Sequence, residues 1–212
     1  MVQSKLPEQG GKVPGPPEPA VASGHGAKLR ALIIEVARSY LGVREDPRAN
    51  NTGAAVEDIL RRAGGKRGMA WCCAFCDVVV EEAHRRLGLK PPLNVGLSCS
   101  SLVKRARELH RVFDDPSEAR EGDLIVLRGG KTLFRHVGIV AEAPAAIATS
   151  PGGGAGTGAA AHTAAAGPTW VKTIEGNTNA AGSAEGDGVY LRRRRCALRP
   201  DHTRPCVFVR VV

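Results

Sequence analysis

Apolar residues recur every three or four positions through the first half of the chain, a spacing that predicts amphipathic helices. We expect one helix over residues 27–41 and a second that ends before Gly64. A third helix is expected over residues 71–87 and a fourth over residues 98–112. Each of the four has apolar side chains on one face, so each is expected to pack on a common core.

The pattern changes after residue 122, where short apolar runs bounded by glycine, proline or charged residues predict β-strands. The expected strands cover residues 124–127, 136–140, 171–175, 188–195 and 206–211. Helices come first in the chain and strands second, and most connections are short. This order favours an α+β fold in which N-terminal helices pack on a C-terminal antiparallel sheet.

Two stretches have no apolar period. Residues 1–26 are rich in proline, glycine, glutamate and lysine, and we expect them to form a disordered tail. Residues 143–169 are mostly alanine and glycine, and we expect a disordered insertion in a loop between two strands. A lid over a substrate is the alternative for that insertion. The chain is therefore expected to contain one domain, residues 27–212, after a tail.

The chain has a net charge of +9, from 30 basic and 21 acidic residues, and this charge bears on the kind of partner that it binds. Such a surface favours nucleic acid, an anionic membrane or an anionic cell-wall polymer, although solubility alone is also a sufficient reason for it. No run approaches the ~20 apolar residues of a membrane-spanning helix. We also find no apolar segment typical of a secretory signal near the N-terminus.

Three of the six cysteines lie at the start of the third expected helix, at Cys72, Cys73 and Cys76. The N-terminus of a helix carries partial positive charge, which favours thiolate over thiol and makes a cysteine there a candidate nucleophile. Cys72 and Cys76 lie near one helix face, whereas Cys73 is turned by about 100°. Only one of Cys72 and Cys73 is therefore expected to face a given base. Cys76, one turn further on, is expected in the core.

The other three cysteines are further along the chain. Cys99 stands alone, and Cys196 and Cys206 flank a probable turn across which they would face each other in a hairpin. Two buried thiols or a disulfide both fit that pair. A zinc site with His202 lacks an evident fourth ligand.

A cysteine nucleophile needs a base, usually histidine, and a group that orients the imidazole. His136 is the best candidate, because it opens an apolar strand that can hold its side chain in place. Glu175 and Asn177 end the next strand, from which a carboxylate and an amide can both reach the imidazole. The alternative is that His136 is an ordinary core histidine and that Glu175 and Asn177 are ordinary turn residues. The remaining histidines are in aperiodic segments, on helices where we expect them to be solvated, or beside a turn: His25, His162, His84, His110 and His202.

Four motifs in order resemble the CHAP family, the cysteine, histidine-dependent amidohydrolases and peptidases related to NlpC/P60 enzymes. They are WCCAF at residues 71–75, GDLIV at 122–126, HVGIV at 136–140 and IEGNTN at 174–179. The segments at residues 42–45 and 50–56 are similar to the lead-in found in bacterial members. The resemblance covers roughly residues 29–195.

The resemblance implies a papain-like α+β fold and a thiol mechanism without metal or cofactor. Cys72 matches the nucleophile, His136 the base, Glu175 the orienting residue and Asn177 an accompanying polar residue. The chain departs from the family at Cys73, where a small residue is common, and in the longer separation between histidine and glutamate.

The function implied is hydrolysis of peptidoglycan, at the muramoyl–alanine amide or within the wall peptides. Two alternatives stay open. One is a binding module that has lost activity and holds anionic wall polymer through its basic face. The other is a thiol amidohydrolase that acts on an amide outside the wall. A wall enzyme without a visible signal would be made in the cytoplasm and reach the wall by phage-type lysis or a secretion system.

Overall fold

Four α-helices and a six-stranded antiparallel sheet make up the structure, a computed structural model that describes residues 23–47, 50–130, 133–144, 170–197 and 204–212. The expected α+β class is confirmed. The helices are α1 (Ser23–Ser39), α2 (Ala54–Arg62), α3 (Cys72–Arg86) and α4 (Cys99–Glu108). In the described part of the chain, none of them has the length and apolar character needed to cross a membrane.

The helix boundaries differ from expectation at two places. α1 begins at Ser23, so residues 23–26 belong to the helix, and only residues 1–22 of the expected tail lie outside the described residues. α4 ends at Glu108 because the chain turns at His110, whose φ of 53° is left-handed. Val112, the residue expected to finish that helix, begins a short strand instead.

The sheet has the strand order β1-β6-β2-β3-β4-β5, with antiparallel pairing throughout. Its strands are β1 (Val112–Phe113), β2 (Leu124–Arg128), β3 (Phe134–Glu142), β4 (Trp170–Thr178), β5 (Gly188–Arg195) and β6 (Cys206–Val209). A short 3₁₀ helix, η1 (Pro116–Glu118), precedes β2. β3 and β4 are neighbours although the long alanine- and glycine-rich segment separates them. Of that segment, residues 145–169 lie outside the described residues.

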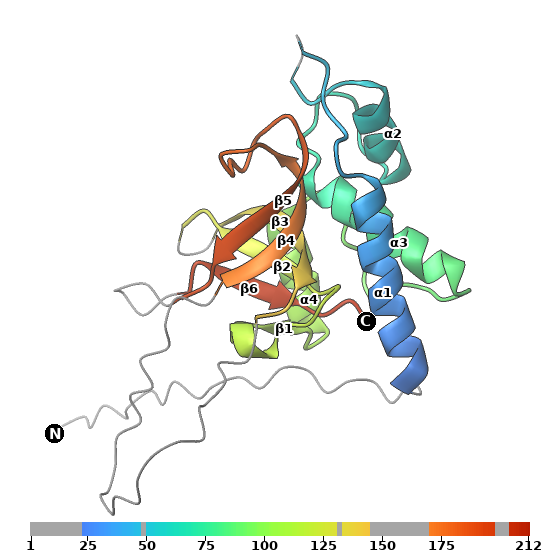
Figure 1. Ribbon diagram of the computed structural model, residues 1–212, viewed down its shortest axis with the longest axis vertical. Coiled ribbons are helices and arrows are strands. Elements are labelled where there is room, and N and C mark those ends of the chain that lie inside the picture. The colour runs from blue at the N-terminus through green and yellow to red at the C-terminus, as the bar shows by residue number, and fades with distance from the viewer. Residues whose placement is uncertain (1–22, 48–49, 131–132, 145–169, 198–203) are drawn as a thin grey trace, which may run out of the picture.

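The two faces of the sheet have separate apolar clusters. α3 packs on β3 and β4, and α1 and α2 pack on α3, so these three helices lie on one side of the sheet (Figure 1). The smaller cluster contains Phe113, Phe208, Cys196 and Cys206. Both of these cysteines are buried free thiols. The hairpin expected between them is wrong, because β2, β3 and β4 lie between β5 and β6 in the sheet. The two thiols nevertheless interact with each other, as expected.

A glycine lets the start of α3 press against β4. A Cβ atom at Gly176 would lie 2.8 Å from Phe75 Cβ and 2.8 Å from Trp71 Cζ3. Both aromatic residues are fully buried. Protein interiors are close-packed, so there is no room for a methyl group at this contact. The height of the first turn of α3 above the sheet therefore depends on Gly176.

We predict that Gly176→Ala lowers the free energy of unfolding by about 1–3 kcal/mol, the usual cost of overpacking. Chemical denaturation followed by circular dichroism measures it. Gly130→Ala is the matched control, because a Cβ there would meet nothing within 4 Å. Equal stability of the two variants would contradict the close packing of α3 on β4.

Candidate active site

Glu45 fixes the start of α3, where Cys72 is the first helical residue. The Trp71 indole Nε1 donates a hydrogen bond to Glu45 Oε1 at 2.8 Å, and the Asn51 backbone N–H donates to Glu45 Oε2 at 2.8 Å. Trp71 is the N-cap residue of α3 and makes no side-chain capping bond. The carboxylate thus connects the loop before α2 to the residue directly before the thiol.

His136 and Glu175 come from adjacent strands, β3 and β4. His136 Nε2 and Glu175 Oε2 are 2.8 Å apart, and both side chains are buried. Gly138 makes room for the carboxylate, because a Cβ there would lie 2.5 Å from Glu175 Cγ. The imidazole is therefore oriented through Nε2. Among the described residues, its buried Nδ1 has no hydrogen-bond partner of standard geometry.

Arg194, on β5, completes the surroundings of the carboxylate and was not predicted as a site residue. Its Nε donates to Glu175 Oε1 at 2.8 Å, and a terminal guanidinium nitrogen contacts Oε2. Thr173 Oγ1 also donates to Oε1, at 2.5 Å. A hint was present in the sequence, since alternate arginines of a strand face opposite sides. In the structure Arg194 is half-buried, whereas Arg193 and Arg195 are exposed.

These contacts set the charges of the pair. Burial raises the pKa of Glu175, but hydrogen bonds from Arg194 and His136 outweigh it and lower that pKa to about 2. Burial lowers the pKa of His136, but interactions with Cys72 and Glu175 outweigh it and raise that pKa to about 9. At neutral pH the site therefore holds a carboxylate and an imidazolium.

Cys72 is the cysteine whose charge matches this imidazolium. Interactions with the neighbouring Cys73 and Cys99 thiols are the largest causes that lower the pKa of Cys72. The interaction with His136 lowers it further, against the opposing effect of burial. Since Glu175 occupies Nε2, Nδ1 is the ring nitrogen left for the thiolate. The geometry thus brings together Cys72, His136 and Glu175 as a thiolate–imidazolium–carboxylate series.

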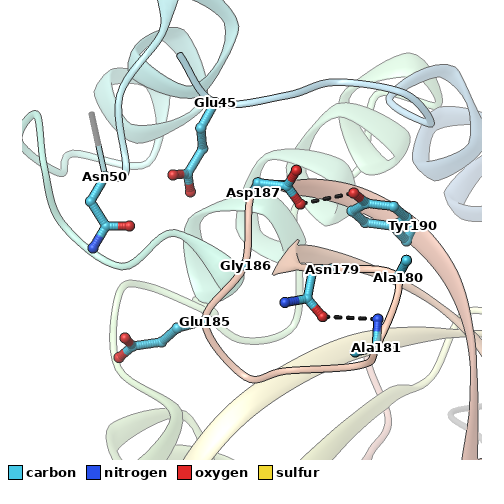
Figure 2. Close-up of a pocket in the computed structure, with 9 residues that line it drawn as sticks. All are labelled: Glu45, Asn50, Asn179, Ala180, Ala181, Glu185, Gly186, Asp187 and Tyr190. Atoms are coloured by element: carbon cyan, nitrogen blue, oxygen red, sulfur yellow. Dashed lines mark hydrogen bonds between the residues drawn. The ribbon is translucent and has the colours of Figure 1, made fainter. Parts of the chain in front are cut away.

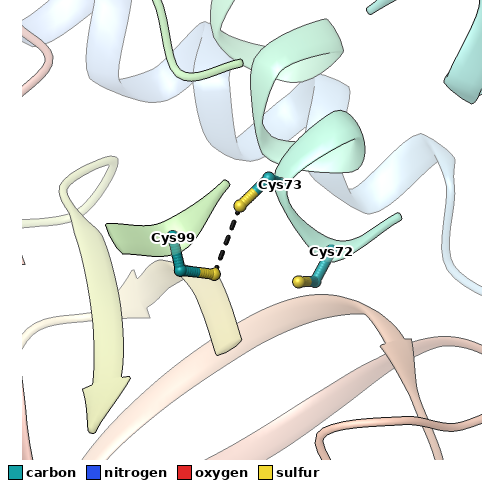
Figure 3. A group of neighbouring side chains, drawn as sticks. All are labelled: Cys72, Cys73 and Cys99. Carbon is teal, nitrogen blue, oxygen red and sulfur yellow. Dashed lines mark hydrogen bonds between the residues drawn. The ribbon is translucent and has the colours of Figure 1, made fainter. Parts of the chain in front are cut away.

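Cys73 is turned away, toward α4. Its Sγ lies 3.2 Å from Cys99 Sγ (Figure 3). Interactions with Cys72 and Cys99, followed by burial, raise the pKa of Cys73. Burial raises the pKa of Cys76, which lies in the core. Neither cysteine is a thiolate at neutral pH.

Asn177 lies close in sequence to Glu175 but makes a different contact. Its Oδ1 accepts a hydrogen bond from the Gly186 backbone N–H at 3.5 Å. Its Nδ2 is buried, and no residue in the described part of the chain hydrogen-bonds to it. A bulge between Glu175 and Thr178 and a left-handed φ of 54° interrupt the strand alternation at Asn177. Within the described residues, its contacts support the β4–β5 connection and do not include the imidazole.

His84 was expected to be solvated, and that expectation is wrong. Only 2% of the residue is exposed, and His84 Nδ1 lies 2.7 Å from the Val80 carbonyl oxygen. Burial lowers the pKa of His84. It is a structural residue of α3 and takes no part in the site.

A polar cavity of about 580 Å³ shares Glu45 with the start of α3 (Figure 2). Two further carboxylates, Glu185 and Asp187, line it, and Tyr190 Oη donates to Asp187 Oδ1 at 2.8 Å. The rest of its wall is formed by Asn50, residues 179–181 and Gly186. Three carboxylates in one cavity of a basic protein favour a ligand with a positively charged group.

No protein-family model, curated protein or solved structure matches this chain. The resemblance to the CHAP family therefore stays a prediction from the motifs. The contacts among Cys72, His136, Glu175 and Arg194 carry the chemical argument.

We predict that iodoacetamide alkylates Cys72 at pH 6 much faster than any other cysteine. An ordinary thiol, with a pKa of about 8.5, is less than about 1% thiolate at that pH. Because the pKa of Cys72 is held well below its usual value, a larger share of Cys72 than of any other cysteine is thiolate at that pH. Peptide mass spectrometry after a short pulse gives the rate for each cysteine. First labelling of Cys73, or a Cys72 rate that rises about tenfold per pH unit from 6 to 8, would contradict this assignment.

We predict that Arg194→Gln lowers the free energy of unfolding by about 3 kcal/mol, because it leaves a buried carboxylate with one cation fewer. Urea denaturation at neutral pH measures the change. Arg195→Gln, on the exposed face of the same strand, is the control and should stay within about 0.5 kcal/mol of the parent. A similar small change for both would show that Glu175 does not depend on Arg194.

Proposed function

We propose that this chain is a cysteine-dependent amidohydrolase or peptidase of the CHAP type, with a papain-like fold, that cleaves an amide bond of peptidoglycan. The observation that carries the proposal is the convergence of Cys72, His136 and Glu175 from α3, β3 and β4. Their charges alternate in sign, from thiolate to imidazolium to carboxylate. A core histidine that served only packing would not need a buried carboxylate on one nitrogen and a low-pKa thiol near the other.

In the first half of the reaction, the Cys72 thiolate attacks the amide carbonyl carbon and forms a C–S bond. The carbonyl oxygen becomes an oxyanion, which unpaired backbone N–H groups at the start of α3 can stabilise by about 3 kcal/mol. The His136 imidazolium gives its proton to the leaving nitrogen, and the C–N bond breaks. The products at this stage are a free amine and a thioester on Cys72.

In the second half, neutral His136 takes a proton from water, and the hydroxide attacks the thioester carbon. The C–S bond breaks, the acid leaves, and the thiolate–imidazolium pair is restored. Glu175 stays ionised throughout and stabilises the imidazolium. Arg194 and Thr173 act as positioning residues, since they hold the carboxylate and do not touch the imidazole.

Two surfaces support a wall substrate. The cavity with Glu45, Glu185 and Asp187 suits a free amine, which peptidoglycan peptides carry on side chains or cross-bridges. The exposed arginines of β5, Arg193 and Arg195, suit an anionic wall polymer. Such a substrate would place the reaction at the bacterial cell wall, after release by phage-type lysis or a secretion system. Asn177 is proposed to support the loop that forms part of the cavity.

We predict that Cys72→Ala abolishes release of soluble fragments from purified sacculi, a loss of at least about a thousandfold. Mass spectrometry of the fragments also identifies the bond that is cut. Cys196→Ala is the matched control, since Cys196 lies in the cluster on the opposite face of the sheet. Circular dichroism of both variants checks that they fold.

The other outcomes separate the alternatives. Activity that survives in Cys72→Ala but is lost in Cys73→Ala would move the nucleophile to Cys73. Salt-sensitive binding to sacculi without turnover would favour the binding module. Hydrolysis of other amides with intact sacculi would favour the third function, a thiol amidohydrolase outside the wall.

A further inference from the structure

Three buried thiols converge where α3 and α4 begin. The Sγ atoms of Cys72, Cys73 and Cys99 all lie within 4.8 Å of one another, and those of Cys73 and Cys99 are 3.2 Å apart (Figure 3). The proposed hydrolysis uses only Cys72. Cys73 and Cys99 lie beside the nucleophile and lower its pKa, but in that reaction they form no bond to the substrate.

The spacing of the sulfur atoms suits a thiophilic metal ion. With a zinc–sulfur bond of about 2.3 Å, tetrahedral coordination places two sulfur ligands about 3.8 Å apart. The Cys73–Cys99 separation of 3.2 Å is shorter than that value and the other pairs lie within 4.8 Å, so side-chain rotations are needed to close the site. An all-sulfur set prefers Zn²⁺, Cd²⁺ or Cu⁺ over the oxygen-seeking Mg²⁺ and Ca²⁺.

Rigid elements hold these ligands. Cys72 and Cys73 are the first two residues of α3, and Cys99 is the first residue of α4. Asp77, on α3, is bonded to the loop that leads into α4. Its Oδ1 accepts hydrogen bonds from the Val95 N–H at 3.1 Å and the Gly96 N–H at 2.9 Å. The third sulfur is thus delivered by a segment that is itself anchored to α3.

The next candidate ligand is His136, which interacts with Cys72, although its ring nitrogens do not lie within 4.8 Å of all three sulfur atoms. Among the described residues, its buried Nδ1 has no hydrogen-bond partner of standard geometry, while Nε2 is held by Glu175. A histidine that binds a metal through one nitrogen and a carboxylate through the other is the usual arrangement at zinc sites.

We propose that Cys72, Cys73 and Cys99 bind one thiophilic d¹⁰ cation of the zinc class, and that the bound metal blocks the nucleophile. Binding forms three metal–sulfur bonds and breaks the S–H bonds of Cys73 and Cys99, whose two protons pass to solvent. If His136 Nδ1 also coordinates, the Nδ1–H bond of the imidazolium breaks as well and a third proton passes to solvent. No electron is transferred. The blocking of catalysis rests on the proposed function, whereas the binding of metal does not.

The test is a titration of the full chain, reduced with a phosphine and freed of metal, with Cd²⁺ as the probe. We expect a sulfur-to-cadmium charge-transfer band that saturates at one equivalent and is displaced by excess Zn²⁺. Cys99→Ser and Cys73→Ser should each weaken binding at least about tenfold. Cys206→Ser, which removes a buried thiol outside the cluster, should bind as the parent does.

Alkylation of Cys72 in the parent chain gives the same test without a substitution, so a variant that misfolds does not decide the result. A missing band, or equal binding by parent, Cys99→Ser and Cys72-alkylated chains, would overturn the metal site. So would a Cys73–Cys99 disulfide together with no metal binding after its reduction.

Sacculus hydrolysis separates this inference from the proposed function. Metal binding by a chain that never cuts sacculi would refute the proposed function and leave the site standing. Hydrolysis that one equivalent of Zn²⁺ does not inhibit would refute the blocking role.

Discussion

The buried carboxylate of Glu175 is the charge on which the arrangement of β3, β4 and β5 depends. An isolated carboxylate in a protein interior costs several kcal/mol, so its partners must be in place whenever the sheet is formed. His136 supplies a partner from β3 and Arg194 one from β5. The same contacts keep the imidazole charged and leave Nδ1 for the thiolate. Stability of the sheet and readiness of the site therefore have a common cause.

The thiol side of the site depends on packing and on one more carboxylate. Gly176 allows the first turn of α3 to approach β4, and Glu45 holds the Trp71 ring that precedes Cys72. The helix and the sheet are thus positioned by contacts directly beside the reacting groups. Small changes at Gly176 would move the sulfur relative to the imidazole without touching either residue.

Local sequence predicted the helices, most strands and the placement of His136 and Glu175 on neighbouring strands, because apolar spacing and short motifs are properties of neighbouring positions. The roles of Cys72, His136 and Glu175 stay a prediction. Arg194 and Gly138 gain their roles only from strand register, which the sequence does not display. The hairpin at Cys196 and Cys206 failed for the same reason, since β6 pairs with β1 and β2. Asn177 was expected beside the imidazole on the assumption that side chains alternate regularly along the strand. The bulge in β4 interrupts that alternation.

The run of four arginines at residues 192–195 has a consequence for how β5 finds its register. If the strand slipped by one residue in either direction, or by two residues in the direction that brings Arg192 into place, another arginine would stand where Arg194 stands now. The carboxylate therefore discriminates poorly among these alignments. The apolar end of the strand does discriminate. Val189 is 1% exposed, and a slip by one residue would turn it to the opposite face of the sheet. The charged end of β5 thus offers Glu175 an arginine in several strand registers. Burial of the apolar end then selects the register in which Arg194 contacts the carboxylate.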